Sequence, residues 1–521
     1  MGYLSRKHTI RDLREALLNL PKTSEGIYES AMERVQCQDK ETAFLANRTL
    51  QCVLGAVRFL RIRELQDALA VREGDHDIDE EALTPPTYLL SICAGLLTFD
   101  QEDGVVRLVH YTAHEYLKEN EQKYFSNAQG ELASICLNYL SLGVFDFVYR
   151  DTLRKNYMQC YQRHALLKYA TQNMGKHASG GFNSATLQHA VKLFLNKSKV
   201  SVAIEATFHA HYRPHNIFSD LTPTHYASYL GLADVVGQLI ERSHEKMDLK
   251  DRYGRTPLSW AARSGHNTVV KLLANTGKVD VDSKDQYGWT PLSWAAENSH
   301  NTVVKLLVNT GKVDVDSKDQ YGRTPLSRAA DSGYDTVVKL LANTGKVDMD
   351  SKDQYSRTPL SFAAARGHNT VVKLLVNTRK VDVDSKDEDG RTPLSWAAWA
   401  GHVAVVKLLV DTGKVDIDLK DQYGRTPLSR AARSGYNEVV KLLVNTGKVD
   451  IDSKDQDSLT PLSRAADSGY DKVVKLLVDT GKVDINSKDE DGQTPLSRAA
   501  RSGHDEVVKL LINTGKVDAV Q

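Results

Sequence analysis

Apolar residues in the second half of the chain recur at the spacing of short helices. In residues 318–351, Val337, Val338, Leu340 and Leu341 are apolar at intervals that place them on one side of a helix. A shorter apolar group before them predicts another helix, formed around Leu326, Ala329 and Ala330. Neither helix is long enough to be stable alone. The pattern therefore predicts paired helices that must pack against neighbouring pairs.

Residues with special backbone preferences mark where these two helices begin and end. Thr324 stands at the expected N-cap, and Pro325 takes the first helical position, where its missing N–H costs nothing. Gly333 is placed for a left-handed C-cap, and Gly345 closes the second helix. The preceding Asp-Gln-Tyr-Gly, which ends at Gly322, predicts a turn. Each unit is thus a turn followed by two helices.

The unit returns every 34 residues without a slip in register. A Thr-Pro-Leu tripeptide or a close variant begins at Thr222, Thr256, Thr290, Thr324, Thr358, Thr392, Thr426, Thr460 and Thr494. A fixed period of this length is the signature of a stacked repeat array. In such arrays each apolar face is covered by the next unit, so stability is a sum over units and interfaces.

The unit GRTPLSRAADSGYDTVVKLL, which begins at Gly322, resembles the ankyrin repeat. The resemblance implies antiparallel helix pairs and turns that project as fingers. The family's Thr-Pro-Leu-His becomes Thr-Pro-Leu-Ser in eight units, whereas the first keeps His225. The period is one residue longer than is usual, and we place the extra residue in the NTGKVDVDSKD connection. We expect an all-α chain, with nine ankyrin units over residues 216–521.

Four residues break the unit's own rule and predict softer points in the array. Ser299 replaces the glycine between the helices, and Ser356 and Ser458 replace the finger glycine. Arg379 replaces the glycine that closes the second helix. A non-glycine residue with a left-handed backbone costs on the order of 1 kcal/mol. We expect these units to show weaker hydrogen-exchange protection than the others.

The units differ at a few offsets, and these offsets predict a binding surface. Variation concentrates four residues after the threonine (the fourth position), seven residues after it (the seventh position) and just before it. The resemblance implies that these offsets face a concave groove. Aromatic residues and arginine, which are enriched in binding hot spots, gather there. The candidate groove residues are Trp260, Trp289, Trp294, Arg328, Phe362, Trp396, Trp399, Arg430, Arg433, Arg464 and Arg498.

A second interpretation of the fourth position is structural. Its residues would pack between adjacent first helices, with arginine stems lying over tryptophan faces. Both interpretations are compatible with the sequence.

Residues 1–200 have no repeat period and are predicted to be mainly helical, with a strand passing into a helix in GVVRLVHYTAHEYLKEN. They resemble the segment that follows the nucleotidase module in fungal NACHT–ankyrin proteins, which are NLR-like signalling ATPases. That segment includes a winged-helix region named after GPI inositol-deacylase. The resemblance implies a winged-helix-like region at 1–127, a helical connection at 128–215 and ankyrin repeats at 216–521. It rests on Leu20-Pro21, Tyr28, Arg63-Glu64-Leu65, Cys93-Ala-Gly-Leu, Val109-His-Tyr and Glu115-Tyr-Leu.

The nucleotide-binding motif of that family is missing from this sequence. A P-loop needs Gly-x-x-x-x-Gly-Lys followed by Ser or Thr, whereas the recurring Gly-Lys here precedes valine, as in Gly277-Lys278-Val279. The last unit also lacks a polar cap, since Val507, Val508, Leu510 and Leu511 follow the standard pattern. We therefore expect a chain that lacks both a NACHT module and a C-terminal cap.

Composition narrows the function without naming a partner. Lys plus Arg and Asp plus Glu both total 67, which gives no bulk attraction to nucleic acid or anionic membranes. The sequence has no apolar run long enough for a membrane span. The five cysteines are scattered and lie outside the repeats, as is typical of reduced thiols. We expect a cytoplasmic protein.

Candidate chemical motifs are weak. His110, His114 and Glu115 are in the wrong order for a zinc protease. The acidic stretch at 280–285 lacks the glycine and the glutamate of a calcium loop. No Gly-x-Ser-x-Gly elbow occurs, and residues 1–130 carry no basic recognition stripe. We expect no catalytic residues, metal, cofactor or small-molecule substrate.

We therefore expect a non-enzymatic scaffold that recognises a protein partner. Two alternatives remain open at this stage. One is a role associated with an enzyme, either as an ATPase or as an accessory to a GPI or lipid hydrolase. The other is nucleic-acid binding through Arg430, Arg464 and Arg498.

Overall fold

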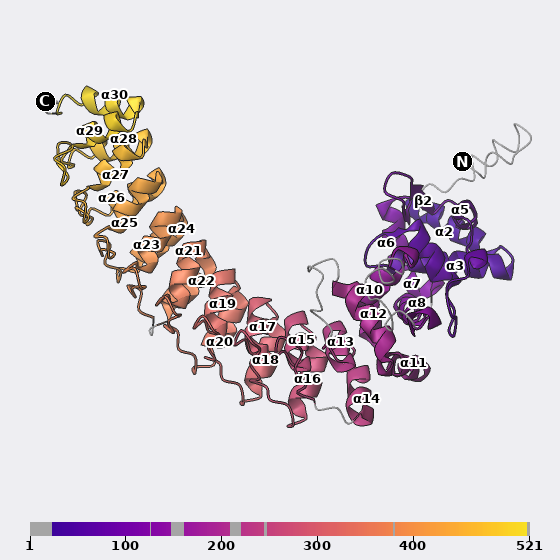
Figure 1. Cartoon of the computed structure of the whole chain (residues 1–521). Coiled ribbons are helices and arrows are strands. Elements are labelled where there is room, and N and C mark those ends of the chain that lie inside the picture. The colour runs from indigo at the N-terminus through magenta and orange to yellow at the C-terminus, as the bar shows by residue number, and fades with distance from the viewer. Residues whose placement is uncertain are drawn as a thin grey trace, which may run out of the picture. The chain divides into compact units, whose positions relative to one another are not determined.

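The computed structural model describes residues 23–125, 127–146, 161–208, 220–243, 247–378 and 381–517 (Figure 1). The chain divides into two compact units, which are described separately. The N-terminal unit extends to Arg252 and includes Thr256–Ala261. The array unit holds Tyr253–Arg255 and the residues from Ala262 onward.

The N-terminal unit begins with a helical region that carries one small sheet. Strands β1 (Leu60–Arg61), β2 (Leu97–Asp100) and β3 (Val105–Leu108) pair antiparallel in the order β1-β3-β2. The β2–β3 hairpin closes at Gly104, whose φ of 67° lies in the left-handed region. The helices of this region are α2 (Ser24–Gln36), α3 (Lys40–Gly55), α4 (Ile62–Ala70), η2 (Glu80–Ala82), α5 (Pro86–Ile92), α6 (Tyr111–Glu119) and α7 (Glu121–Tyr124).

The strand that passes into a helix is confirmed as β3 followed by α6. His110 is the N-cap of α6, and its Nδ1 accepts the backbone N–H of Thr112 at 3.3 Å. This histidine of the rejected zinc pattern therefore has a local structural role. His114 and Glu115 are exposed on α6. Within the described ranges, no group of three His, Cys, Asp or Glu side chains could hold a metal ion.

A buried polar cluster joins α4 to the helix α8 (Ala128–Leu140). Asp67 accepts a hydrogen bond from the hydroxyl of Tyr139 at 2.8 Å and pairs with Arg63 at 2.9 Å. Burial raises the pKa of Asp67, which these two partners oppose. Arg63 also pairs with Glu80 at 2.8 Å. The Arg63-Glu64-Leu65 motif of the sequence is therefore structural, since Glu64 caps α4 and pairs with Arg58.

The rest of the N-terminal unit is a helical stack. It contains η3 (Gly143–Asp146), α10 (Leu167–His177), η4 (Ala178–Gly180), α11 (Ser184–Leu195) and α12 (Lys197–Phe208), and then the first repeat pair, α13 (Pro223–Leu230) and α14 (Ala233–Ser243). Four cysteines lie in the described residues and are free thiols, whereas Cys160 lies outside them. Burial raises the pKa of Cys52 and Cys93 to about 12. These two thiols are poor nucleophiles.

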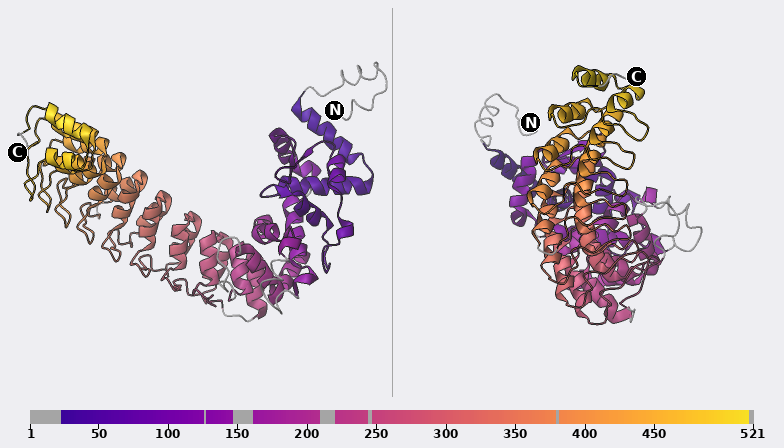
Figure 2. Two further views of the ribbon diagram at one scale, coloured as in Figure 1. Left: turned by 45° about the horizontal axis from the view of Figure 1, so that its top comes forward. Right: turned by 90° about the vertical axis from the view of Figure 1, so that its left-hand side faces the viewer.

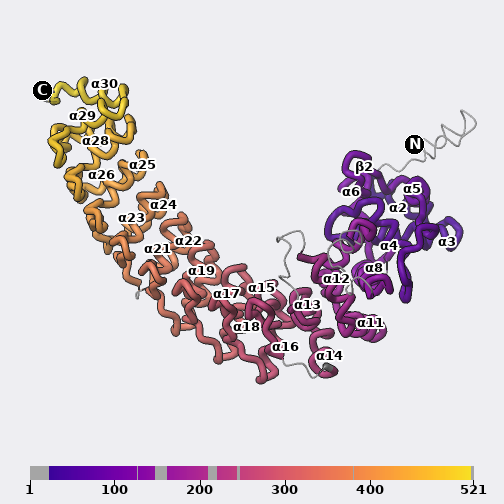
Figure 3. Tube along the Cα trace, viewed as in Figure 1, coloured from indigo at the N-terminus to yellow at the C-terminus, as the bar shows by residue number. Residues whose placement is uncertain are grey.

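The array continues as helix pairs that follow one another along the chain (Figures 2 and 3). From α17 onward the first helices pack on first helices of the next unit, and from α16 onward the second helices do the same. The pairs are α15 (Pro257–Ser264) with α16 (Asn267–Asn275), α17 (Pro291–Glu297) with α18 (Asn301–Asn309), α19 (Pro325–Ser332) with α20 (Asp335–Ala342), α21 (Pro359–Arg366) with α22 (Asn369–Asn377), α23 (Pro393–Ala400) with α24 (Val403–Asp411), α25 (Pro427–Ser434) with α26 (Asn437–Asn445), α27 (Pro461–Asp467) with α28 (Asp471–Asp479), and α29 (Pro495–Arg501) with α30 (Asp505–Asn513).

The predicted helix signals are confirmed in the array. Thr324 is the N-cap of α19 and its hydroxyl accepts the backbone N–H of Ser327 at 3.2 Å. Pro325 follows at the first helical position, and Gly333 caps the end with φ 77°. Leu326 is fully buried. The same arrangement recurs along the array, so the all-α repeat architecture expected from the sequence is confirmed.

The unusual serines occupy the backbone conformation that the sequence predicts. Ser299, Ser356 and Ser458 have φ of 58°, 59° and 57°, which matches the glycines at equivalent places. Arg379 lies outside the described residues. The lower protection expected at these units stays a prediction.

Aspartates in the connections form a ladder of hydrogen bonds from unit to unit. The Oδ2 atom of Asp316 accepts the backbone N–H of Asp348 at 2.9 Å, and Asp418 accepts that of Asp450 at the same distance. The ladder aspartates are Asp282, Asp316, Asp350, Asp384, Asp418 and Asp452. The first of them lies in the stretch considered as a calcium loop. That acidic stretch therefore has a structural role in joining neighbouring units.

Candidate protein-binding surface of the repeat array

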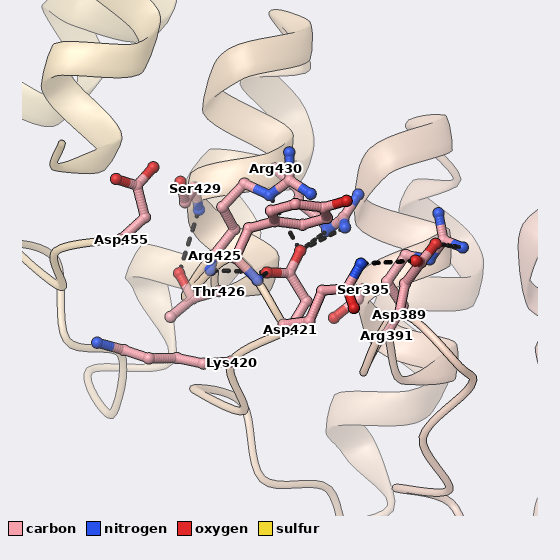
Figure 4. A network of polar contacts seen from close by, with 12 residues as sticks. Asp389, Arg391, Ser395, Lys420, Asp421, Arg425, Thr426, Ser429, Arg430 and Asp455 are labelled. Atoms are coloured by element: carbon pink, nitrogen blue, oxygen red, sulfur yellow. Dashed lines mark hydrogen bonds and ion pairs between the residues drawn. The ribbon is translucent and has the colours of Figure 1, made fainter. Parts of the chain in front are cut away.

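In six units one buried aspartate organises the base of the finger. In the unit drawn in Figure 4, Asp421 Oδ1 accepts the backbone N–H groups of Tyr423 at 2.8 Å and Arg425 at 2.9 Å. These two bonds fix the turn that precedes Thr426. The finger aspartates with this pattern are Asp285, Asp319, Asp353, Asp387, Asp421 and Asp455.

The residue at the fourth position binds the second oxygen of the same aspartate. Trp294 donates its indole N–H to Asp285 at 3.2 Å, and Trp396 donates to Asp387 at 2.9 Å. Trp260 does the same to Asp251 at 3.1 Å, within the N-terminal unit. The fourth position is therefore tied to its own finger. Arg328, Arg430, Arg464 and Arg498 contact Asp319, Asp421, Asp455 and Asp489 in the same way.

The side chain of Phe362 has no hydrogen-bond donor, so another residue of its unit donates to the finger aspartate. Arg357, just before the threonine, donates from Nε and Nη2 to Asp353 at 3.0 and 2.8 Å. The Arg357 guanidinium lies 4.5 Å from the centre of the Phe362 ring, and that of Arg323 lies 4.8 Å away. The aromatic ring is thus covered by two cations. It is only 4% exposed.

The candidate residues of the earlier units form an aromatic and cationic cluster. Trp289 and Trp294 have ring centres 4.4 Å apart, and the Arg328 guanidinium lies 3.3 Å from the centre of Trp289. Arg263 covers Trp294 at 4.8 Å. In each of these two pairs a guanidinium group lies over a tryptophan ring, and one partner, Arg328 or Trp294, stands at the fourth position.

Trp399 and Arg433, at the seventh position, are more exposed than the candidate residues at the fourth position. Trp260 is 2% exposed, and the side chain of Arg430 is 7% exposed. Trp399, at the seventh position, is 49% exposed, and Arg433 is exposed as well. Trp399 meets the ring of Trp396 edge-on, with centres 5.6 Å apart. Membership of the full candidate set in a binding groove stays a prediction, and these two residues are its most accessible members.

In some units the residue at the seventh position supplies a carboxylate to the fourth-position arginine of the next unit. Glu297 lies 3.4 Å from Arg328, and Asp467 lies 3.7 Å from Arg498. In the unit that precedes Arg430, the residue that corresponds to Glu297 is Trp399. A cavity of about 440 Å³ lies here, and we call it the Arg430 cavity. It is lined by Trp399, Arg425, Arg430, Arg433, Ser434 and Tyr470.

The pKa values of two finger aspartates, Asp285 and Asp421, shift in opposite directions. Burial raises the pKa of Asp285, which is bonded to a tryptophan. Burial acts in the same direction on Asp421, but the backbone N–H of Arg425 and the charge of Arg430 outweigh it, so the pKa of Asp421 is lowered. Desolvation lowers the pKa of Arg430, although Asp421 opposes this effect. The Asp421 site is thus held in its ionised form.

Sequence reasoning missed a row of exposed tyrosines on the fingers. Tyr287, Tyr321, Tyr355 and Tyr423 are 43%, 47%, 49% and 48% exposed. Asp389, Asp457 and Asp491 replace the tyrosine in other units, but this place lies outside the three offsets that define the candidate groove residues. Their position in the Asp-Gln-Tyr-Gly turn is the signal that could have identified them.

Both parts of the chain match known families. The ankyrin repeats model (three copies) matches residues 183–285, 276–353, 338–421, 360–455 and 428–520. The chain belongs to the ankyrin-repeat family, since these matches together cover more than half of it. The winged helix domain of GPI inositol-deacylase matches residues 32–129. A comparison with curated proteins gave no match.

These findings support a repeat protein with a winged-helix region before its ankyrin units. The boundaries at 127 and 215 stay a prediction. Ankyrin repeats favour a protein-interaction scaffold and protein partners. None of the helices in the described part of the chain combines the length and the hydrophobicity that crossing a bilayer requires.

Proposed function

We propose that the array is a non-enzymatic recognition surface for a protein partner, with its contacts centred on the exposed seventh position. The observation that carries this proposal is the placement of Trp399 and Arg433. Both side chains are exposed beside a finger base whose aspartate is already bonded. Exposed aromatic and arginine side chains on a rigid support are typical of binding hot spots.

The larger context is an NLR-like signalling protein in the cytoplasm, in which the array would be the sensing part. The order of a winged-helix region followed by ankyrin repeats supports this proposal. A name derived from a deacylase describes the winged-helix shape, and a fold alone does not assign an activity.

The buried arginines favour a structural role over nucleic-acid contact. Arg430, Arg464 and Arg498 all bond to finger aspartates, which neutralise much of their charge. Binding of nucleic acid through them predicts an affinity that falls steeply with salt. The protein-binding proposal predicts a much weaker dependence.

A cross-linking pull-down with matched variants tests the proposal. The wild type is compared with the double variant Trp399→Ala, Arg433→Ala, and with Lys407→Ala as a control. Lys407 is exposed on the second helix of the same unit as Trp399. We expect the double variant to recover partners at least about tenfold less well, because hot-spot truncations cost about 2 kcal/mol or more. Equal recovery by all three proteins would contradict it.

A further inference from the structure

The array contains junctions in which a buried arginine has two carboxylates and one in which a carboxylate is missing. Arg328 contacts Asp319 of its own unit and Glu297 of the preceding unit. Arg498 likewise contacts Asp489 and Asp467. Arg430 contacts Asp421, but the preceding unit presents Trp399. The scaffold is the same, so the difference lies in one side chain.

The Arg430 cavity lies at this junction. Its volume of about 440 Å³ falls within the range of roughly 300–1,000 Å³ that is usual for pockets of whole small molecules, so it can admit a single side chain. Glu297 and Asp467 show that a carboxylate at the corresponding place can reach the guanidinium. The cavity therefore has room beside Trp399 for an incoming side chain that reaches Arg430 as the acidic residue reaches its arginine at other junctions.

Positive charge at the Arg430 cavity exceeds negative charge. Arg425 and Arg430 both donate to the same oxygen of Asp421. Arg433 has no ion pair to any residue in the described part of the chain. Three guanidinium groups thus face one carboxylate, which leaves an excess of two positive charges. Guanidinium groups bind carboxylates through paired, directed hydrogen bonds.

We propose that the Arg430 cavity binds an aspartate or glutamate side chain of the protein partner, whose carboxylate contacts Arg430 beside Trp399 as Glu297 and Asp467 contact the arginines of other junctions. The proposal rests on the proposed function, because it assigns chemistry to the partner of that surface. Trp399 and Tyr470 line the same cavity and are 49% and 38% exposed. An apolar residue beside the acidic one packs against these rings.

Selection from a random library of displayed peptides tests this assignment on the full chain. The wild type is expected to enrich peptides with Asp or Glu next to an apolar residue. The exposed Arg433→Glu variant is expected to lose this enrichment, because its carboxylate removes the excess charge. For an enriched peptide, replacing the acidic residue by its amide is expected to weaken binding about tenfold or more, since a charge-assisted hydrogen bond is lost.

The matched control is Arg501→Glu. Arg501 is also exposed and stands at the seventh position, but in the last unit, away from the Arg430 cavity. This variant is expected to enrich the same peptides as the wild type. Circular dichroism checks that both variants remain folded. Loss of the acidic preference in both variants would overturn the assignment to this cavity.

The remaining outcomes separate this inference from the proposed function. Enriched peptides that need Trp399 but carry no acidic preference overturn the carboxylate site and leave protein recognition standing. Failure to enrich any peptide that depends on Trp399 overturns both. Tighter binding of a single-stranded oligonucleotide or a phosphorylated peptide than of the acidic peptide overturns the carboxylate assignment. Retained enrichment with the tenfold loss in the amide peptide supports it.

Discussion

The neighbourhoods of Arg328 and Arg430 share one backbone arrangement and differ in how they balance charge. Both arginines stand at the fourth position and contact the finger aspartate of their own unit. Around Arg328, Glu297 adds a second carboxylate and the ring of Trp289 covers the guanidinium. Around Arg430, the seventh position before it is an exposed tryptophan. The first junction is satisfied internally, and the second presents unbalanced charge beside a cavity.

The two neighbourhoods show that the scaffold and the exposed residues of the seventh position can vary independently. The finger aspartate fixes the turn through backbone N–H groups whichever residue occupies the fourth position. Substitution at the seventh position then changes exposure and charge without disturbing that support.

Removal of the finger aspartate should destabilise the Arg430 neighbourhood more than the Arg328 neighbourhood. Asp421→Ala leaves two buried or half-buried arginines without their carboxylate, and we expect a loss of about 3–5 kcal/mol in local stability. Asp319→Ala should cost at least about 1 kcal/mol less, because Arg328 keeps Glu297. Hydrogen exchange of α25 and α19 measures the two effects. Equal losses would show that Glu297 does not stabilise its junction.

Backbone strain offers a rival explanation for any difference in stability between the two neighbourhoods. Ser356 lies between them with φ 59°, and Ser356→Gly should stabilise α21 by about 1 kcal/mol. The matched control is Gly322→Ser, whose added Cβ would lie 2.9 Å from the backbone nitrogen of Gln354. It should destabilise its finger by at least as much. Hydrogen exchange that is unchanged in the glycine variant would remove this site from the predicted soft points.

A carboxylate introduced at position 399 should make the Arg430 junction similar to the Arg328 junction. Trp399→Glu is expected to stabilise α25 by up to about 1 kcal/mol, as is usual for an ion pair near the surface. It should also abolish binding of an acidic peptide, because the Arg430 cavity is then filled from within. Trp399→Gln serves as the uncharged control. Calorimetric titration and hydrogen exchange measure both effects, and tight binding by the glutamate variant would refute the equivalence.

Substitution of a ladder aspartate should change stability equally near Arg328 and near Arg430, because the same hydrogen bond is present in both neighbourhoods. Burial raises the pKa of Asp316 and Asp418, so their ionised forms weaken the folded state at neutral pH. Asp316→Asn and Asp418→Asn should each stabilise by about 0.5 kcal/mol or less, since solvent screens these half-buried groups. The chain itself has Asn486 at the corresponding place.

The sign of this effect can be checked with pH. The gain should be full above the raised pKa of the folded aspartate, shrink as the pH falls through it, and disappear below the ordinary value of 3.8. Denaturant unfolding of both variants at several pH values measures it. Unequal increases in stability would contradict the prediction. They would mean that the connections, as well as the seventh position, differ between the two neighbourhoods.

Much of the fold follows from the sequence because its signals are local. Thr324, Pro325 and Gly333 each act within a few residues, and the structure confirms their roles. The left-handed backbone of Ser356 was also predicted from its alignment with glycines. The strand before α6 was recognised from its β-branched residues, whereas the two-residue strand β1 is too short to leave a pattern.

The site is less predictable because its contacts join residues that are about one unit apart. Variation identified Trp399 and Arg433, but it did not distinguish them from the buried Trp260 and Phe362. Burial at the fourth position depends on the finger aspartate, which is nearly constant and therefore drew no attention. Exposure at the seventh position depends on what the neighbouring unit supplies. Both properties emerge only when the units are stacked.

The contact between Glu297 and Arg328 has a consequence for how such an array can evolve. It joins the seventh position of one unit to the fourth position of the next, so the charge balance of a junction belongs to adjacent pairs and not to single units. Exchange or duplication of a whole unit would leave the scaffold intact and create two new pairings at its borders. Nearly identical units can therefore produce new patterns of surface charge and exposure by a change in their order alone.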